Sequence, residues 1–316
     1  MYKHFGINYD PTSFKIWYPS CTRTPLKWTE EIKLSAKTVA ESTNRDIWIC
    51  MSGGIDSEVV ASTFKNLNIP FKALIAKFPD ELNLHDISYA INWCKNNNIE
   101  YKIFEFDMVS FLNEGYKKYL NQNLISNNVF RYYTIELLQQ IEDMNGYGIL
   151  GGKSAGLSLQ QRTNYSIDLN NDPVCDTYDI GSLAPIEWCR KNNLNHSVFF
   201  YQTTPEIHSA YLKDPVNQLL INNPYILASG LSSVPAKTLM MRSHFPHTIP
   251  RIKYHGFEKL MNIRLSTQIA MAKYFGLDSV LENKRFDSIL SNNQIAIPIN
   301  EVFAQLGDEN FTRSMN

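Results

Sequence analysis

Short apolar runs alternate with helical repeats through the first half of the chain. The runs at 47–51, 71–78, 101–106 and 147–150 have the length of buried strands. Between them, apolar residues at helical spacing predict helices at about 26–42, 84–97, 109–122 and 129–145, and another that carries Val59, Val60 and Phe64. Strands that alternate with helices of this length predict a parallel sheet with right-handed crossovers, and therefore an α/β fold.

The second half of the chain has a different pattern. Between Thr163 and Trp188, aspartates are mixed with Asn, Tyr and Pro, which indicates a loop-rich lid whose carboxylates could bind an amine or a second Mg²⁺. Thr203 and Glu206 have the spacing of a capping box at a helix start, and 257–274 predicts an amphipathic helix. We therefore divide the chain into an N-terminal extension with one helix (1–44), an α/β core (45–190) and a mainly helical C-terminal domain (191–316).

Composition and charge narrow the class of protein. The net charge is −1, which argues against a whole-protein nucleic-acid or membrane surface, and no apolar run is long enough to span a membrane. The five cysteines include no C-x-x-C pair, and the N-terminus lacks a signal-peptide pattern. We therefore expect a cytoplasmic protein without a disulfide framework, and the oligomeric state stays open, with a homodimer among the options.

The most informative stretch is the break between the first apolar run and the helix after it. Gly53 and Gly54 lie there, and without a Cβ they can take positive φ and let the backbone approach an anion. Backbone N–H groups, a helix N-terminus and the Ser52 and Ser57 hydroxyls are all donors to phosphate. Asp56 cannot attract a phosphate itself, so we interpret it as a ligand of a Mg²⁺ ion that bridges phosphate oxygens.

The run Ser52-Gly53-Gly54-Ile55-Asp56-Ser57 resembles the S-G-G-x-D-S signature of the PP-loop ATP pyrophosphatase superfamily. This superfamily includes asparagine, NAD and GMP synthetases, tRNA-thiolating and lysidine-forming enzymes, and sulfonucleotide reductases. The resemblance implies a Rossmann-like (HUP-type) core, ATP with Mg²⁺, and pyrophosphate binding by all six residues. It implies an adenine site near Met51, Ala76 and Phe78, and the nearest relatives it suggests are asparagine synthetase-like domains. The alternative is an ordinary tight turn between a strand and a helix.

A second glycine-rich turn, Gly151-Gly152-Lys153-Ser154-Ala155-Gly156, follows the fourth apolar run. In a parallel sheet the turns after Met51, Ala76 and Leu150 share one rim, where ligands bind. By the resemblance, Lys153 lies near the α-phosphate or the leaving pyrophosphate and acts with Asp56 in catalysis, while Gly151 and Gly152 border the acceptor. The alternative is an exposed surface loop.

The segment 237–264 is strongly basic in a nearly neutral chain. It contains six basic residues and one acid, Glu258, so that six minus one gives a local charge of +5. Its densest part holds Arg251 and Lys253, which we interpret as an anion or acceptor site, against the alternative of solvated charges that point in different directions. A zinc site at His244, His247 and His255 matches metal-ligand spacing poorly.

By the resemblance, Cys94 and Cys175 are candidates for the pair of cysteines that tRNA-thiolating relatives use. Cys94 lies on an apolar helical face and is interpreted as a core residue, whereas Cys175 lies in the polar stretch and is the one to test for reactivity. Tyr2 stands where many asparagine synthetases carry an N-terminal Cys nucleophile.

These features favour an AMP-forming synthetase. A carboxylate or amide oxygen of a small-molecule acceptor attacks the α-phosphate of ATP, pyrophosphate leaves, and ammonia or an amine takes the adenylate. On this interpretation the C-terminal domain binds the acceptor. Two alternatives remain: a tRNA-modifying enzyme that thiolates or aminates a base, and a nucleotide sensor without turnover.

Overall fold

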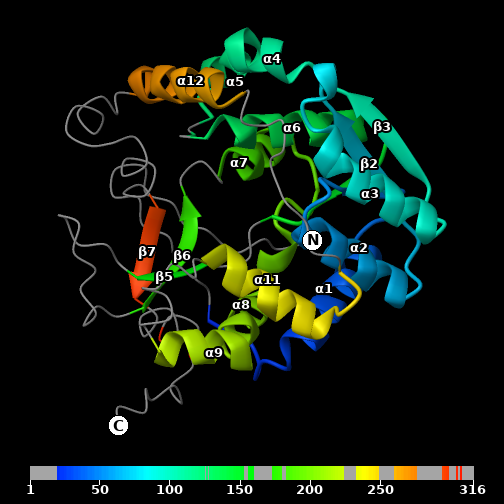
Figure 1. Cartoon of the computed structure of the whole chain (residues 1–316), viewed down its shortest axis with the longest axis vertical. Coiled ribbons are helices and arrows are strands. Elements are labelled where there is room, and N and C mark those ends of the chain that lie inside the picture. The colour runs from blue at the N-terminus through cyan, green and yellow to red at the C-terminus, as the bar shows by residue number, and fades with distance from the viewer. Residues whose placement is uncertain are drawn as a thin grey trace.

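The computed structural model describes residues 20–124, 126, 128–152, 156–159, 173–179, 183–223, 233–248, 260–275, 294–298, 304 and 307 (Figure 1). The elements of its first half are α1 (Trp28–Glu41), β1 (Ile47–Cys50), α2 (Ile55–Asn66), β2 (Lys72–Lys77), η1 (Pro79–Glu81), α3 (Leu84–Asn96), β3 (Tyr101–Glu105), α4 (Met108–Ser110), η2 (Phe111–Gly115), α5 (Lys117–Asn121), α6 (Val129–Glu142) and β4 (Tyr147–Leu150). Those of its second half are β5 (Gly156–Leu159), β6 (Pro173–Asp179), α7 (Leu183–Lys191), η4 (Phe200–Gln202), α8 (Pro205–Leu212), α9 (Pro215–Asn222), α11 (Ser233–His244), α12 (Met261–Tyr274) and β7 (Gln294–Pro298).

A four-stranded parallel sheet organises the first half, in the order β3-β2-β1-β4. The four predicted strands and the α/β fold class are therefore confirmed. The chain steps from β1 to β2 to β3 in one direction and returns to the other side of β1 for β4, so the order reverses between β1 and β4. Right-handed crossovers of this order place α2 and α3 on one face and α6 on the other.

Burial on both faces explains why β1 and β4 have no polar alternation. All four residues of each strand are buried, as expected for central strands covered by helices. The predicted inner faces of the helices are confirmed, since Ile32, Val59 and Ile87 are each at most 1% exposed. Cys94 belongs to this core, and burial raises the pKa of its thiol to about 11. The helix predicted at 109–122 is instead three short pieces, α4, η2 and α5.

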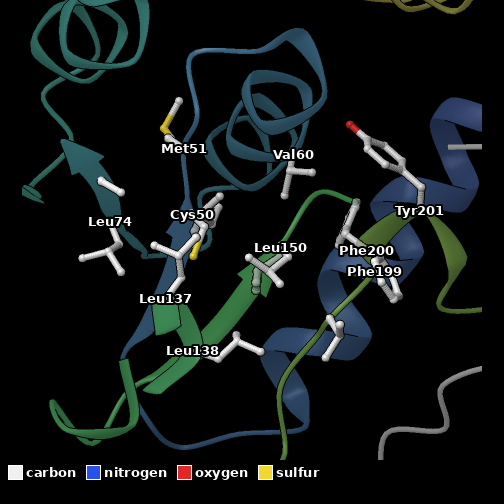
Figure 2. Packing of buried hydrophobic residues seen from close by; sticks show 14 of the residues in the cluster. Cys50, Met51, Val60, Leu74, Leu137, Leu138, Leu150, Phe199, Phe200 and Tyr201 are labelled. Atoms are coloured by element: carbon white, nitrogen blue, oxygen red, sulfur yellow. The ribbon is translucent and has the colours of Figure 1, made fainter. Parts of the chain in front are cut away.

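A segment from the second half completes the sheet. Ser197 forms a parallel bridge with Ile149, and backbone bonds of 2.9 Å join Leu150 N to Ser197 O and Ser197 N to Gly148 O. The aromatic residues that follow, Phe199 to Tyr201, pack in the same cluster as Val60 and Leu150 (Figure 2). The β4 edge is therefore covered by chain from beyond residue 190.

A second, antiparallel sheet contains β5, β6 and β7, and it lies on the opposite side of the molecule from β2 and β3 (Figure 1). It corrects one prediction, because the region 163–188 contains strand β6 and the start of α7 where we expected a loop-rich lid. The described residues beyond 191 are mainly helical, as predicted, with β7 as an added strand. On one side β6 pairs with β7, which is far away in the chain, and its local sequence, with Asp, Thr and Pro, carries little strand signal.

The predicted capping box is also wrong. Thr204, not Thr203, is the N-cap of α8 and accepts a hydrogen bond from Ile207 N at 3.3 Å. The Glu206 carboxylate accepts instead from Thr22 N at 2.6 Å and Thr22 Oγ1 at 2.8 Å, and so fastens the N-terminal segment. The helix predicted at 257–274 begins at Met261 in the described residues. None of the helices in the described ranges combines the length and the apolar character of a membrane span.

Candidate functional site

The loop between β1 and α2 depends on one glycine. Gly53 has φ of +76°, and a Cβ built on it would lie 1.8 Å from the carbonyl oxygen of Asp86 in α3. Only glycine fits there, because it both tolerates this φ and leaves room for the α3 backbone. Gly54 differs from our expectation, since it is the extended N-cap of α2 with φ of −82°.

Two serines brace the loop from inside. Ser57 Oγ donates to Gly54 O at 3.0 Å and accepts from Ser52 N at 3.3 Å, while Ser52 Oγ accepts from Gly54 N at 3.3 Å. The two N–H···O distances are longer than the usual range of about 2.7–3.2 Å, so these amides are weakly held. Ser57 is buried and Ser52 is exposed. The Ser52 and Gly54 N–H groups can therefore be transferred to a stronger acceptor, such as a phosphate oxygen.

Asp56 is the charged centre of the loop. Its carboxylate receives the Lys237 ammonium from α11 at 2.8 Å and 2.7 Å, one distance to each oxygen. The Lys237 and Asp56 side chains are only 12% and 17% exposed. Tyr201 donates from its hydroxyl to the backbone oxygen of Asp56 at 2.6 Å, and burial raises the pKa of Tyr201 well above its ordinary value. Two segments of the second half thus converge on one residue of the loop.

Asp56 was also predicted as the magnesium ligand. Within the described ranges, no three His, Cys, Asp or Glu side chains come together as a metal-binding group. Mg²⁺ in nucleotide sites is usually held by one or two carboxylates together with phosphate oxygens and water. A single carboxylate beside the phosphate loop fits a metal that arrives with a nucleotide, and Lys237 occupies both of its oxygens in the structure.

The turn after β4 lies next to this loop, as predicted. A Cβ built on Gly151 would lie 3.4 Å from the backbone of Asp56. Gly152 has φ of +71° and stands against Phe199, whose ring would be 2.7 Å from a Cβ. Gly151 and Gly152 therefore join the phosphate loop to the 197–201 segment. Lys153 lies outside the described residues, and its predicted catalytic role stays a prediction.

The predicted adenine site at the end of β2 is occupied by a side chain. Met51, Ala76 and Phe78 are all buried. Asn83 donates from Nδ2 to Ala76 O at 2.9 Å and accepts at Oδ1 from Phe78 N, also at 2.9 Å. The backbone groups that a base would use at this strand end are therefore paired with a carboxamide.

The described members of the basic segment face different partners. Lys237 contacts Asp56, and the Arg264 guanidinium lies 4.9 Å from the centre of the Phe130 ring. His244 Nε2 lies 2.5 Å from Asp214 Oδ2. Arg251, Lys253, Lys259 and His255 lie outside the described residues. The anion site proposed for Arg251 and Lys253 stays a prediction.

Two solved synthetase structures are similar to this chain at low sequence identity. No protein-family model and no curated protein matches the chain. NMN synthetase from Francisella tularensis is 21% identical over 39% of this chain and 52% of its own, with a TM-score of 0.30. The NH3-dependent NAD synthetase from Campylobacter jejuni subsp. jejuni NCTC 11168, in complex with nitrate, is 21% identical over 72% of this chain and 99% of its own, with a TM-score of 0.31. The chain thus spans about half of the length of the first of these proteins.

Proposed function

We propose that this chain is an ATP-dependent, AMP-forming synthetase that binds the nucleotide phosphates at residues 52–57. The observation that supports this most is the left-handed Gly53 at the start of α2, with the Lys237–Asp56 pair beside it. The loop follows β1 at the point where the strand order reverses, which is where ligands bind in open parallel sheets. Its sequence is the S-G-G-x-D-S signature that predicted this chemistry.

The loop donors account for the departure of pyrophosphate. When an acceptor oxygen attacks the α-phosphate, negative charge accumulates on the leaving diphosphate. The N–H groups of Ser52 and Gly54, together with the positive end of α2, stabilise that charge without reorganising the backbone. Gly53 keeps the loop close to α3, and Ser57 holds it from within. The chain contributes orientation and electrostatics and forms no covalent bond to the substrate.

Asp56 and Lys237 have different roles in this proposal, one toward the metal and one toward the phosphates. Asp56 would hold a Mg²⁺ ion that arrives with the nucleotide, and the ion would neutralise negative charge on the phosphates. Lys237 holds the Asp56 carboxylate in the structure, and its flexible stem would let the ammonium turn toward a phosphate. Lys237 therefore fulfils in this proposal the role that the sequence assigned to Lys153.

The acceptor is proposed as a small molecule with a carboxylate or amide oxygen, and the nucleophile as ammonia or an amine. The kinship to asparagine synthetase-like domains stays a prediction, as does binding of tRNA. Lys237 contributes little to an RNA surface in this structure, because it is turned inward onto Asp56.

The test is pyrophosphate release from ATP and Mg²⁺, assayed with a panel of carboxylates and amides, ammonia, and total tRNA. We expect ATP binding and acceptor-dependent pyrophosphate, and we expect Asp56→Asn to lower the rate by at least about a hundredfold. Asp46→Asn is the matched control, since Asp46 pairs with Lys72 at 3.0 Å but precedes β1 at the opposite end of the sheet. Absence of ATP binding, or equal activity in the two variants, would refute the proposal. Tight binding without turnover would identify the sensor instead.

A further inference from the structure

At the end of β2, the carbonyl of Ala76 and the N–H of Phe78 point to the side on which β1 would continue if it were longer. Leu74 O still accepts from Met51 N at 2.9 Å, so β1 and β2 are paired up to that point. β1 then turns into the phosphate loop. Backbone groups alternate sides along a strand, so Ala76 and Phe78 face the same side as Leu74. Lys77 faces β3, where its oxygen accepts from Phe106 N at 2.9 Å.

Asn83 fills the place of the missing strand. It is 6% exposed, and its carboxamide makes both of the bonds described above, one to Ala76 O and one to Phe78 N. The two partners fix the orientation of the amide, because Ala76 O can only accept and Phe78 N can only donate. Asn83 precedes α3 as its N-cap, yet its side chain makes no capping bond. The side chain is therefore committed to β2 and not to its own helix.

The turn that carries Asn83 is strained and borders the phosphate loop. Asp80 and Glu81 have φ of +52° and +57°, in the left-handed region that side chains disfavour. Such residues persist where the surroundings hold them, and they concentrate at sites that bind or switch. Asp86, in the first turn of α3, is the residue whose carbonyl meets Gly53. Asn83 and the phosphate loop therefore contact the same end of α3.

We propose that the Asn83 carboxamide holds the place of a nucleobase, which displaces it when the nucleotide binds. This rests on the proposed function. When Asn83 moves away, the end of β2 offers one hydrogen-bond acceptor, Ala76 O, and one donor, Phe78 N–H. Adenine offers the complement through its N6 amino group and N1, in the same arrangement as a primary amide. Hypoxanthine and guanine offer the reverse, with a carbonyl oxygen beside a ring N–H.

Two consequences follow for recognition and movement. A base with an amino group beside a ring nitrogen makes the same two hydrogen bonds that Asn83 gives up, whereas inosine leaves two buried groups mismatched. A bidentate pair of this kind discriminates by about tenfold to hundredfold. Displacement also frees the turn at Asp80 and Glu81 to leave its strained conformation, so base binding and opening of this turn are coupled.

The experiment compares ATP, ITP and inorganic tripolyphosphate by calorimetry on the full chain. We expect ATP to bind at least tenfold more tightly than ITP, with ITP close to tripolyphosphate, by the discrimination above. Asn83→Ala removes the competitor and should tighten ATP binding by about tenfold while leaving tripolyphosphate unchanged. Asn97→Ala is the matched control, because Asn97 ends the same helix and donates to Trp93 O. Amide hydrogen exchange over 79–83 should rise with ATP and not with tripolyphosphate.

The outcomes separate the two proposals. Equal affinity for all three ligands, with Asn83→Ala without effect or weakening them equally, would leave the phosphate loop in place and make Asn83 only a structural brace. Binding of none of the three by the wild-type protein would overturn the proposed function and this inference together. A thermal midpoint for Asn83→Ala near that of Asn97→Ala excludes misfolding as the cause of any change.

Discussion

Replacing Lys237 with Met should destabilise the fold through the carboxylate that it leaves behind. Methionine keeps most of the apolar stem of lysine, so packing in α11 changes little while the ammonium is lost. Asp56 then retains a negative charge whose side chain is 17% exposed, and neither of its oxygens keeps its bond to Nζ. The perturbation therefore isolates the charge pair from the packing around it.

The magnitude follows from burial and geometry. Removing one partner of a fully buried ion pair costs about 3–5 kcal/mol, and a charge-assisted hydrogen bond contributes about 1.5–3 kcal/mol. The pair is mostly but not fully buried, so water can reach the carboxylate in part. We expect a loss of about 2–3 kcal/mol in the free energy of unfolding. Lys33→Met is the matched control, because Lys33 pairs with Glu30 at the same 2.8 Å but both side chains are about half exposed. Such surface pairs contribute roughly 0–1 kcal/mol.

The assay is urea unfolding followed by tryptophan fluorescence, with Asp56→Asn and the double variant completing a thermodynamic cycle. Trp28 is a suitable local probe, since its ring stacks on Tyr201 with centroids 6.0 Å apart, and Tyr201 bonds the Asp56 backbone. We expect a coupling energy of about 2 kcal/mol between positions 56 and 237. Additive effects, or a loss for Lys237→Met no larger than for Lys33→Met, would refute the pairing and with it the role given to Lys237.

Two further predictions concern backbone space and acid stability. Gly53→Ala should lower the free energy of unfolding by at least about 3 kcal/mol and abolish nucleotide binding, because its Cβ would lie 1.8 Å from Asp86 O at a positive φ. Gly151→Ala is the control: its Cβ makes an ordinary 3.4 Å contact, so it should change the free energy of unfolding by less than about 1 kcal/mol. Similar losses in the two variants would contradict this explanation. Burial lowers the pKa of His208 from 6.5 to about 3, so below pH 6.5 the unfolded chain binds a proton that the native state refuses. Stability should fall by about 1.4 kcal/mol per pH unit from pH 6.5 toward 3 on this account, and His208→Leu should remove that slope; an unchanged slope would show that other groups cause it.

The parallel sheet could be predicted from the sequence because each of its strands is marked by its own run of apolar residues. A strand buried on both faces is a continuous apolar run, and the run at 147–150 coincides with β4. The phosphate loop could also be predicted from the sequence, since a glycine pair between a strand and a helix indicates few structures other than a tight turn or an anion site. The sequence could not show which glycine takes positive φ, because that depends on where α3 packs.

Lys237 shows why the rest of the site could not be predicted. The sequence singled out the basic segment that contains it, but emphasised Arg251 and Lys253, where the charge is densest. Lys237 and Asp56 are 181 positions apart, and no local pattern tells which of six basic side chains turns inward. The contact depends on the docking of α11, which is a tertiary event.

Asn83 was missed for a different reason. The chain is rich in asparagine, so one more at a helix start suggests only a cap. Its side chain bonds to β2 because β1 ends early and leaves two backbone groups to satisfy. The need for a hydrogen-bond partner at Ala76 and Phe78 can be recognised only when the register of β1 against β2 is known.

The bridge between Ser197 and β4 also sets an order for biosynthesis. The backbone groups of Gly148 and Leu150 find their outer partner only when residue 197 has been made, 47 positions after β4 ends. Until then the nascent polypeptide carries an unpaired and largely apolar sheet edge, the kind of surface that promotes strand addition between molecules. Fragments that stop near residue 190 would keep that edge permanently, and should aggregate where the full-length protein does not.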